Sequence, residues 1–122
     1  HSIEDIFGKQ IYSDKTIEKE FLQKRKQLWF KLKNKGFEKD ITFFLDTKYN
    51  EEFDMYLYMD VGYSTLELVA KDIFYSPYGA TSLREYFANS FEAFFMKEQI
   101  SRLKRISPAA YRKNVMLLNM EK

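Results

Sequence analysis

One stretch of this sequence, residues 78–95, constrains the fold most because it specifies both the start of a helix and the face that the helix buries. Tyr78 and Gly79 form a turn-like pair that leads to Thr81 and Ser82, and either of these two residues can be the N-cap of a helix. Glu85 stands three residues after Ser82, which is the spacing of a capping box. Apolar residues then recur mostly at intervals of three and four, namely Phe87, Ala88, Phe91, Phe94 and Phe95. The pattern predicts a helix that buries an aromatic face and carries a carboxylate in its first turn.

Two further helices are predicted by similar signals. Residues 15–35 have apolar side chains at helical spacing, namely Ile17, Phe21, Leu28 and Leu32. Near the other end, Ser107 precedes Pro108, and proline is favoured at the first position of a helix. We therefore expect a long helix early in the chain and a last helix that begins at Pro108.

Residues 41–63 show a different periodicity. Ile41 to Leu45 is a short β-like run, and a turn-like segment over residues 46–50 follows it. Alternation then places six apolar residues on one side, namely Phe53, Met55, Leu57, Met59, Val61 and Tyr63. We predict a small β-hairpin here, and thus an α+β fold that is mainly α. The 122 residues are enough for a single domain, which we expect to span residues 1–122.

The distribution of charge argues against a nucleic-acid partner. Residues 15–40 hold nine Lys or Arg and four Asp or Glu, residues 41–74 hold two and seven, and residues 97–122 hold seven and two. Because basic and acidic segments alternate, the positive charge is not gathered on one surface, as nucleic-acid binding normally requires. A solvated surface explains the Lys-rich helix more simply, so we expect no nucleic acid among the partners.

Two absences restrict the chain further. No apolar run approaches the ~20 residues of a membrane-spanning helix, so no membrane span is expected. The sequence has no cysteine, so any zinc ion must be held by nitrogen and oxygen ligands. Lack of cysteine does not fix the compartment, and a secreted, virion-associated or toxin-associated location is compatible with it.

Three blocks of the sequence stand in a characteristic order. The first, residues 1–8, reads His-small-aliphatic-acid-Asp-x-x-Gly. The second, residues 78–91, reads Tyr-Gly-x-Thr-x-x-x-Glu-aromatic-Phe-Ala-x-small-Phe, and the third, residues 107–111, is similar to Ala-Pro-x-x-Tyr. In content and order these blocks resemble the anthrax lethal factor family of zinc metalloproteases, which includes the Pro-Pro endopeptidases. The resemblance covers both ends of the chain and lapses between about residues 10 and 70.

The resemblance implies a zinc site with His1 and Glu85 as two of its three protein ligands. His1 would be the second histidine of the family's His-Glu-x-x-His helix, so the first histidine and the glutamate that acts as general base would lie upstream. Tyr78, seven positions before Glu85 as in the family, would be the catalytic phenol that steadies the oxyanion or protonates the leaving amine. Residues 1–122 would then be the C-terminal part of a longer zincin-like metallopeptidase domain, attached to further domains. Its substrate would be a protein or peptide.

The residues assigned to this zinc site are also compatible with roles that involve no catalysis. His1 is the only histidine, so the chain cannot complete a site with two histidines and one glutamate, and His1 could also be a remnant of a purification tag. A relative that keeps the helical scaffold without the metal would serve as a protein-binding module. Tyr78, one of nine tyrosines, could be a half-buried turn residue, and Glu85 could be only a cap. If the predicted hairpin is a substrate element, it should flank the same cleft.

Overall fold

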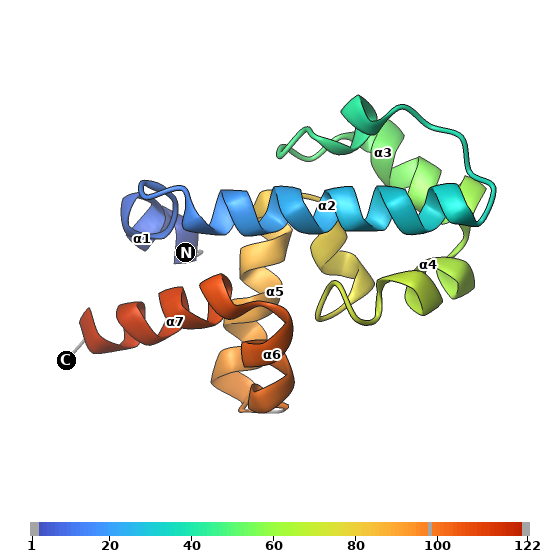
Figure 1. The fold of residues 1–122 in the computed structure, drawn as a ribbon. Coiled ribbons are helices and arrows are strands. Elements are labelled where there is room, and N and C mark those ends of the chain that lie inside the picture. The colour runs from blue at the N-terminus through green and yellow to red at the C-terminus, as the bar shows by residue number, and fades with distance from the viewer. Residues whose placement is uncertain (1–2, 98, 121–122) are drawn as a thin grey trace.

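The structure is a computed structural model that describes residues 3–97 and 99–120, and Figure 1 shows how its helices are arranged. Its α-helices are α1 (Ile3–Tyr12), α2 (Thr16–Asn34), α3 (Glu51–Met55), α4 (Tyr63–Ala70), α5 (Leu83–Met96), α6 (Ile100–Ile106) and α7 (Pro108–Met120). Two short 3-10 helices, η1 (Ile41–Phe44) and η3 (Pro77–Ala80), and a π-helix, η2 (Tyr56–Val61), complete the regular structure. The described ranges contain no β-strand, so this part of the fold is mainly α, as predicted. They also contain no helix with the length and apolar character needed to cross a membrane.

Helix α2 is the element against which most of the others pack. It runs along most of the width of the molecule in Figure 1, and α1, α4, α5, α7 and η1 all contact it. Its buried side carries Ile17, Phe21, Leu28 and Leu32, as the apolar spacing predicts. The helix ends before Gly36, which has a φ of 98° that only glycine adopts without strain.

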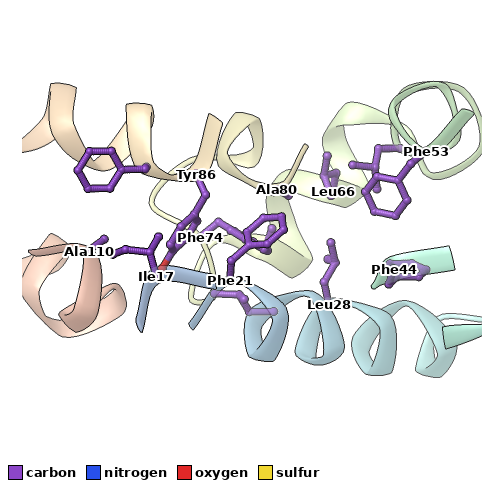
Figure 2. Close-up of a cluster of buried hydrophobic side chains, with 14 of the residues drawn as sticks. Ile17, Phe21, Leu28, Phe44, Phe53, Leu66, Phe74, Ala80, Tyr86 and Ala110 are labelled. Carbon is purple, nitrogen blue, oxygen red and sulfur yellow. The ribbon is translucent and has the colours of Figure 1, made fainter. Parts of the chain in front are cut away.

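The core follows the buried side of α2 from one end to the other. Figure 2 shows Ile17 and Ala110 at one end, Phe21 with Phe74 and Tyr86 in the middle, and Phe44 and Phe53 at the far end. The Phe21 ring centroid lies 5.5 Å from that of Tyr86 and 6.4 Å from that of Phe74. Phe44 and Phe53 meet edge to face at 5.1 Å, an arrangement that aromatic pairs favour.

Helix α5 begins where the sequence predicts but buries a different face. Ser82 is the N-cap, and its hydroxyl accepts a hydrogen bond from the Glu85 amide at 3.1 Å. The buried residues are Tyr86, Phe87, Ser90 and Ala93, whereas Phe91 and Phe94 are half-buried and Phe95 is 48% exposed. Beyond Phe87 the predicted aromatic face is therefore only partly buried: Phe91 packs at the edge of the core, and the Phe94 ring lies 5.8 Å from that of Tyr111 in α7.

The predicted β-hairpin over residues 41–63 is wrong, since this segment is helical. Phe53, Leu57 and Val61 are buried as the alternation implies, but Met55 and Met59 are 53% and 75% exposed. Tyr56, which the alternation placed on the outer side, is buried. Residues four positions apart share a face in both a strand and a helix. The burial of Phe53, Leu57 and Val61 therefore does not distinguish the two structures.

A helix cap decides the structure of this segment. The Asn50 side chain accepts a hydrogen bond from the Phe53 amide at 3.1 Å, and Glu51, Glu52 and Asp54 place acid in the first turn of α3. Both features stabilise the start of a helix. The chain then continues into η2, where the Gly62 amide donates to the Leu57 carbonyl at 3.0 Å.

A buried network joins α2, α5 and α7. The Tyr86 phenol donates to Glu20 Oε1 at 2.6 Å and lies 3.0 Å from Ser107 Oγ. The two carboxylate oxygens of Glu20 also accept the amides of Ala109 and Ala110 at 2.6 and 3.2 Å. Glu20, in α2, therefore caps the start of α7. The same network fixes Tyr86, the residue after Glu85, to the core.

Candidate active site

The candidate site is built on the turn that precedes α5, residues 77–82, which we call the site turn. Pro77 begins η3, and the Tyr78 carbonyl accepts hydrogen bonds from the Thr81 amide at 3.2 Å and the Thr81 hydroxyl at 2.8 Å. Ser82 then caps α5, so only a few ordered residues separate Tyr78 from Glu85. The local sequence thus holds both residues at the same end of α5.

Gly79 allows the site turn to lie directly on α5. A Cβ atom added at Gly79 would meet Asn89 Oδ1 at 3.1 Å, which is closer than ordinary van der Waals contact. The Ser76 hydroxyl donates to the same oxygen at 3.1 Å. A side chain at Gly79 would therefore require the Asn89 side chain to shift by a few tenths of an ångström, so the glycine is explained by a close approach to α5 and not by a positive φ.

The structure brings together the two predicted site residues that lie within its described ranges. The Tyr78 phenol lies close enough to the Glu85 carboxylate for that charge to be the largest influence on its pKa. The negative charge of Glu85 and, to a smaller extent, partial burial raise the pKa of Tyr78 above its usual value, so the phenol stays protonated at neutral pH. Tyr78 is 56% exposed and Glu85 is partly exposed, so both remain accessible to a ligand.

A second group of residues lies beside Tyr78 that the sequence did not single out as a site. It consists of Tyr49, Asp54 and Tyr58, which we call the acidic wall. The Tyr49 hydroxyl donates to Asp54 Oδ2 at 3.0 Å, and this bond is the main reason why the pKa of Tyr49 is raised. Asp54 and Tyr58 are close enough to Tyr78 to contribute to the rise in its pKa.

The acidic wall is attached to the start of α5. The Leu83 amide donates to the Thr47 carbonyl at 2.8 Å, which fixes the segment before α3 to the first turn of α5. The segment predicted as a substrate element therefore does flank Tyr78 and Glu85, although it is helical. Asp54 and Tyr58 are four positions apart, so they share a face in a strand as well as in a helix, and their spacing does not show that this face lies beside Tyr78.

An open hollow of about 750 Å³ extends from Glu85 between α1, the acidic wall and α5. Its lining includes Tyr12, Lys48, Tyr49, Arg84 and Glu85. The volume is within the range of roughly 300–1,000 Å³ that ligand sites in proteins occupy. Glu85 thus lines a space that could receive a ligand, and its charge also acts on the Tyr78 phenol.

The predicted metal ligands are only partly described by the structure. Glu85 supplies a carboxylate at the edge of the hollow, which is a donor type that zinc accepts. His1 lies outside the described residues. Within those residues no group of three or more His, Cys, Asp or Glu is placed to hold a metal ion. Glu85 alone therefore represents the predicted zinc site in the described part of the chain.

Comparison with known proteins does not assign this chain to a family. No protein-family model, curated protein or solved structure matches this chain. The resemblance to the lethal factor family therefore depends on the three sequence blocks.

Proposed function

We propose that this chain forms the C-terminal part of a zincin-like domain and acts as a zinc-dependent endopeptidase on a protein or peptide substrate. The observation that carries the proposal is the proximity of the Tyr78 phenol to the charge of Glu85, which lines an open hollow. These two residues come from different elements, and they are the phenol and the carboxylate that the family resemblance assigns to one site.

His1 and Glu85 would hold the metal together with a histidine upstream of the chain. A bound zinc ion polarises the substrate carbonyl and lowers the pKa of its water molecule, so that the water can attack a peptide bond at neutral pH. The partly exposed Glu85 carboxylate fits this role because it borders a space that a metal and a substrate could share. The upstream glutamate would act as general base.

Tyr78 would donate a hydrogen bond to the substrate oxygen as negative charge develops on it. The phenol is protonated at neutral pH, because the nearby Glu85 carboxylate raises its pKa, so its O–H is available as a donor. A donor that is fixed before the reaction stabilises the transition state without the cost of reorganising solvent. The hydrogen bonds of the site turn hold the Tyr78 backbone and so limit the positions that its ring can take.

A second candidate function, a metal-free module that binds a partner protein, is favoured by one observation. Large apolar side chains are exposed along residues 49–68, namely Tyr49, Met55, Tyr58, Met59, Tyr63 and Leu68. Exposed apolar residues that gather on one segment are typical of interaction surfaces. The same surface could also bind the peptide substrate of an enzyme, so it does not by itself separate the two functions.

Zinc-dependent hydrolysis of peptides tests the proposal. The protein that contains this chain, expressed with the residues preceding it, should copurify with equimolar zinc and cleave members of a peptide library. A chelator should abolish cleavage, and added zinc should restore it. A folded protein that binds no zinc and cleaves no peptide would contradict the proposal and favour the binding module.

A further inference from the structure

A single buried guanidinium lies directly beneath the candidate site. Arg25 is in the middle of α2, is 1% exposed and is among the largest fully buried side chains of the described residues. Burial lowers its pKa to about 10, and the charge of Asp46 opposes this shift, so Arg25 remains cationic at neutral pH. Burying a charged guanidinium costs free energy of folding unless its N–H donors are all hydrogen-bonded.

The three donor groups of Arg25 reach two separate parts of the site. Nε donates to the Ala80 carbonyl at 2.7 Å and Nη2 donates to the Thr81 carbonyl at 3.1 Å, both in the site turn. Nη1 donates to the Phe44 carbonyl at 2.9 Å, in the 3-10 helix before the acidic wall. One planar side chain therefore joins the turn that carries Tyr78 to the segment that leads to Asp54.

Two aromatic rings hold the guanidinium in this orientation. Its central carbon lies 4.0 Å from the ring centroid of Phe53 and 4.7 Å from that of Phe21. Phe53 belongs to α3, one residue before Asp54. The ring contacts therefore fix Arg25 to the same helix that carries Asp54 of the acidic wall.

We propose that Arg25 is a positioning residue of the candidate active site, which sets the placement of Tyr78 relative to Glu85 and Asp54 without touching the substrate. The proposal rests on the proposed peptidase function. An apolar side chain of similar volume often stabilises a protein core as much as a buried cation does. The stability of the core therefore does not by itself explain why position 25 is an arginine. A lysine could not replace it, because an ammonium group lacks the rigid fork that meets three carbonyls in different directions.

Arg25→Lys tests the proposal, with Lys24→Met as the matched control. Lys24 is the neighbouring cation on α2 and is also buried, at 8% exposed, but its charge is influenced by Glu20 and not by the site turn. In the complete enzyme, Arg25→Lys should lower kcat by about 10- to 100-fold with a much smaller change in KM, because misplacing a catalytic group by about 1 Å can cost that much. Lys24→Met should leave both constants near their parent values.

Amide hydrogen exchange gives a second measurement that does not depend on activity. In Arg25→Lys, exchange should accelerate at Thr81 and Leu83, whose amides bond to Tyr78 and Thr47, and stay unchanged at Leu103 in α6. Phe53→Leu, which removes one ring from the guanidinium, should produce the same local pattern more weakly. If the parent lacks peptidase activity but the local pattern occurs, the proposed function fails and the positioning of the turn stands.

Two results would overturn the positioning role. One is a parent-like kcat in a folded Arg25→Lys enzyme. The other is exchange that accelerates equally at Leu103 and Thr81 in both the Arg25 and the Phe53 variants, because that pattern shows a general loss of stability.

Discussion

Two neighbouring residues of α5, Glu85 and Tyr86, take part in tyrosine–carboxylate pairs that differ in almost every physical respect. The closed pair, Tyr86 with Glu20, is in the core, where Tyr86 is 3% exposed and donates to Glu20 at 2.6 Å. The open pair, Tyr78 with Glu85, is at the surface beside a hollow, where Tyr78 is 56% exposed. Both pairs raise the pKa of the phenol, but burial is the main cause for Tyr86 and the Glu85 charge is the main cause for Tyr78.

The difference shows which pair is available for chemistry. Glu20 accepts the Tyr86 phenol and two amides of α7, so its oxygens are engaged in joining three helices. In the open pair, Glu85 lines a space that could admit a metal and a peptide. We therefore assign assembly of the fold to the closed pair and the proposed catalytic role to the open pair. The predictions that follow separate these roles.

Replacing Glu85, the carboxylate of the open pair, should have the largest effect on activity. Glu85→Gln should abolish zinc binding and peptide cleavage together, because a neutral amide is a poor substitute for a carboxylate ligand. Its free energy of unfolding without metal should change by less than about 1 kcal/mol, the usual size of a charge effect in the first turn of a helix. Metal analysis and urea unfolding of the same preparation would measure both quantities. A variant that retains stoichiometric zinc would remove Glu85 from the site.

Replacing Glu20, the carboxylate of the closed pair, should lower stability and leave activity unchanged. Glu20→Ala removes the acceptor of the Tyr86 phenol and the cap of α7, and should lower the free energy of unfolding by about 2–3 kcal/mol. Trp29, the single tryptophan, gives a fluorescence signal for the unfolding transition. At a temperature where the variant is folded, kcat should match the parent. An unchanged stability would show that the closed pair does not hold the helices together.

A smaller, pH-dependent effect is expected at the ion pair between Asp14, which precedes α2, and Lys113 of α7, which is buried. Asp14 Oδ2 lies 2.6 Å from Lys113 Nζ, and hydrogen bonds from Lys113 and Thr16 lower the pKa of Asp14 from 3.8 to about 2. Because the folded-state pKa is depressed, the stabilisation is present above about pH 4 and is lost as the pH falls toward 2.

Since Asp14 is half exposed, the contribution of this ion pair should be no more than about 1 kcal/mol. Unfolding measured across that pH window should show a smaller loss in Asp14→Asn than in the parent. If the two proteins lose the same free energy of unfolding as the pH falls, a group other than Asp14 causes the acid sensitivity.

The elements that the sequence predicted correctly are those specified by local signals. The Ser82 cap, Pro108 and the apolar spacing of α2 are each contained within a few turns of one helix. The same kind of signal is present at Asn50, which is followed by acidic residues, but the alternation of residues 53–63 predicts a strand over the same segment. Met55 and Met59, which are exposed, are the positions at which the strand pattern fails.

The candidate site was only half predictable for a related reason. Tyr78 and Glu85 are seven residues apart, so a motif within one turn and one helix brings them together. Asp54 reaches Tyr78 through contacts that span much longer sequence separations, such as the bonds from Arg25 to Phe44, Ala80 and Thr81. No local periodicity contains such information, because it depends on how helices pack.

The distinction between the open and closed pairs is tested most directly by comparing Tyr78→Phe with Tyr86→Phe, each of which removes one hydroxyl and leaves a ring that still packs. For both variants, kcat and the free energy of unfolding should be measured side by side. Tyr78→Phe should lower kcat about a hundredfold, equivalent to on the order of 3 kcal/mol, with stability within about 0.5 kcal/mol of the parent. Tyr86→Phe should keep kcat and lose about 2 kcal/mol of stability. Full turnover in a folded Tyr78→Phe enzyme would contradict the catalytic role assigned to the open pair.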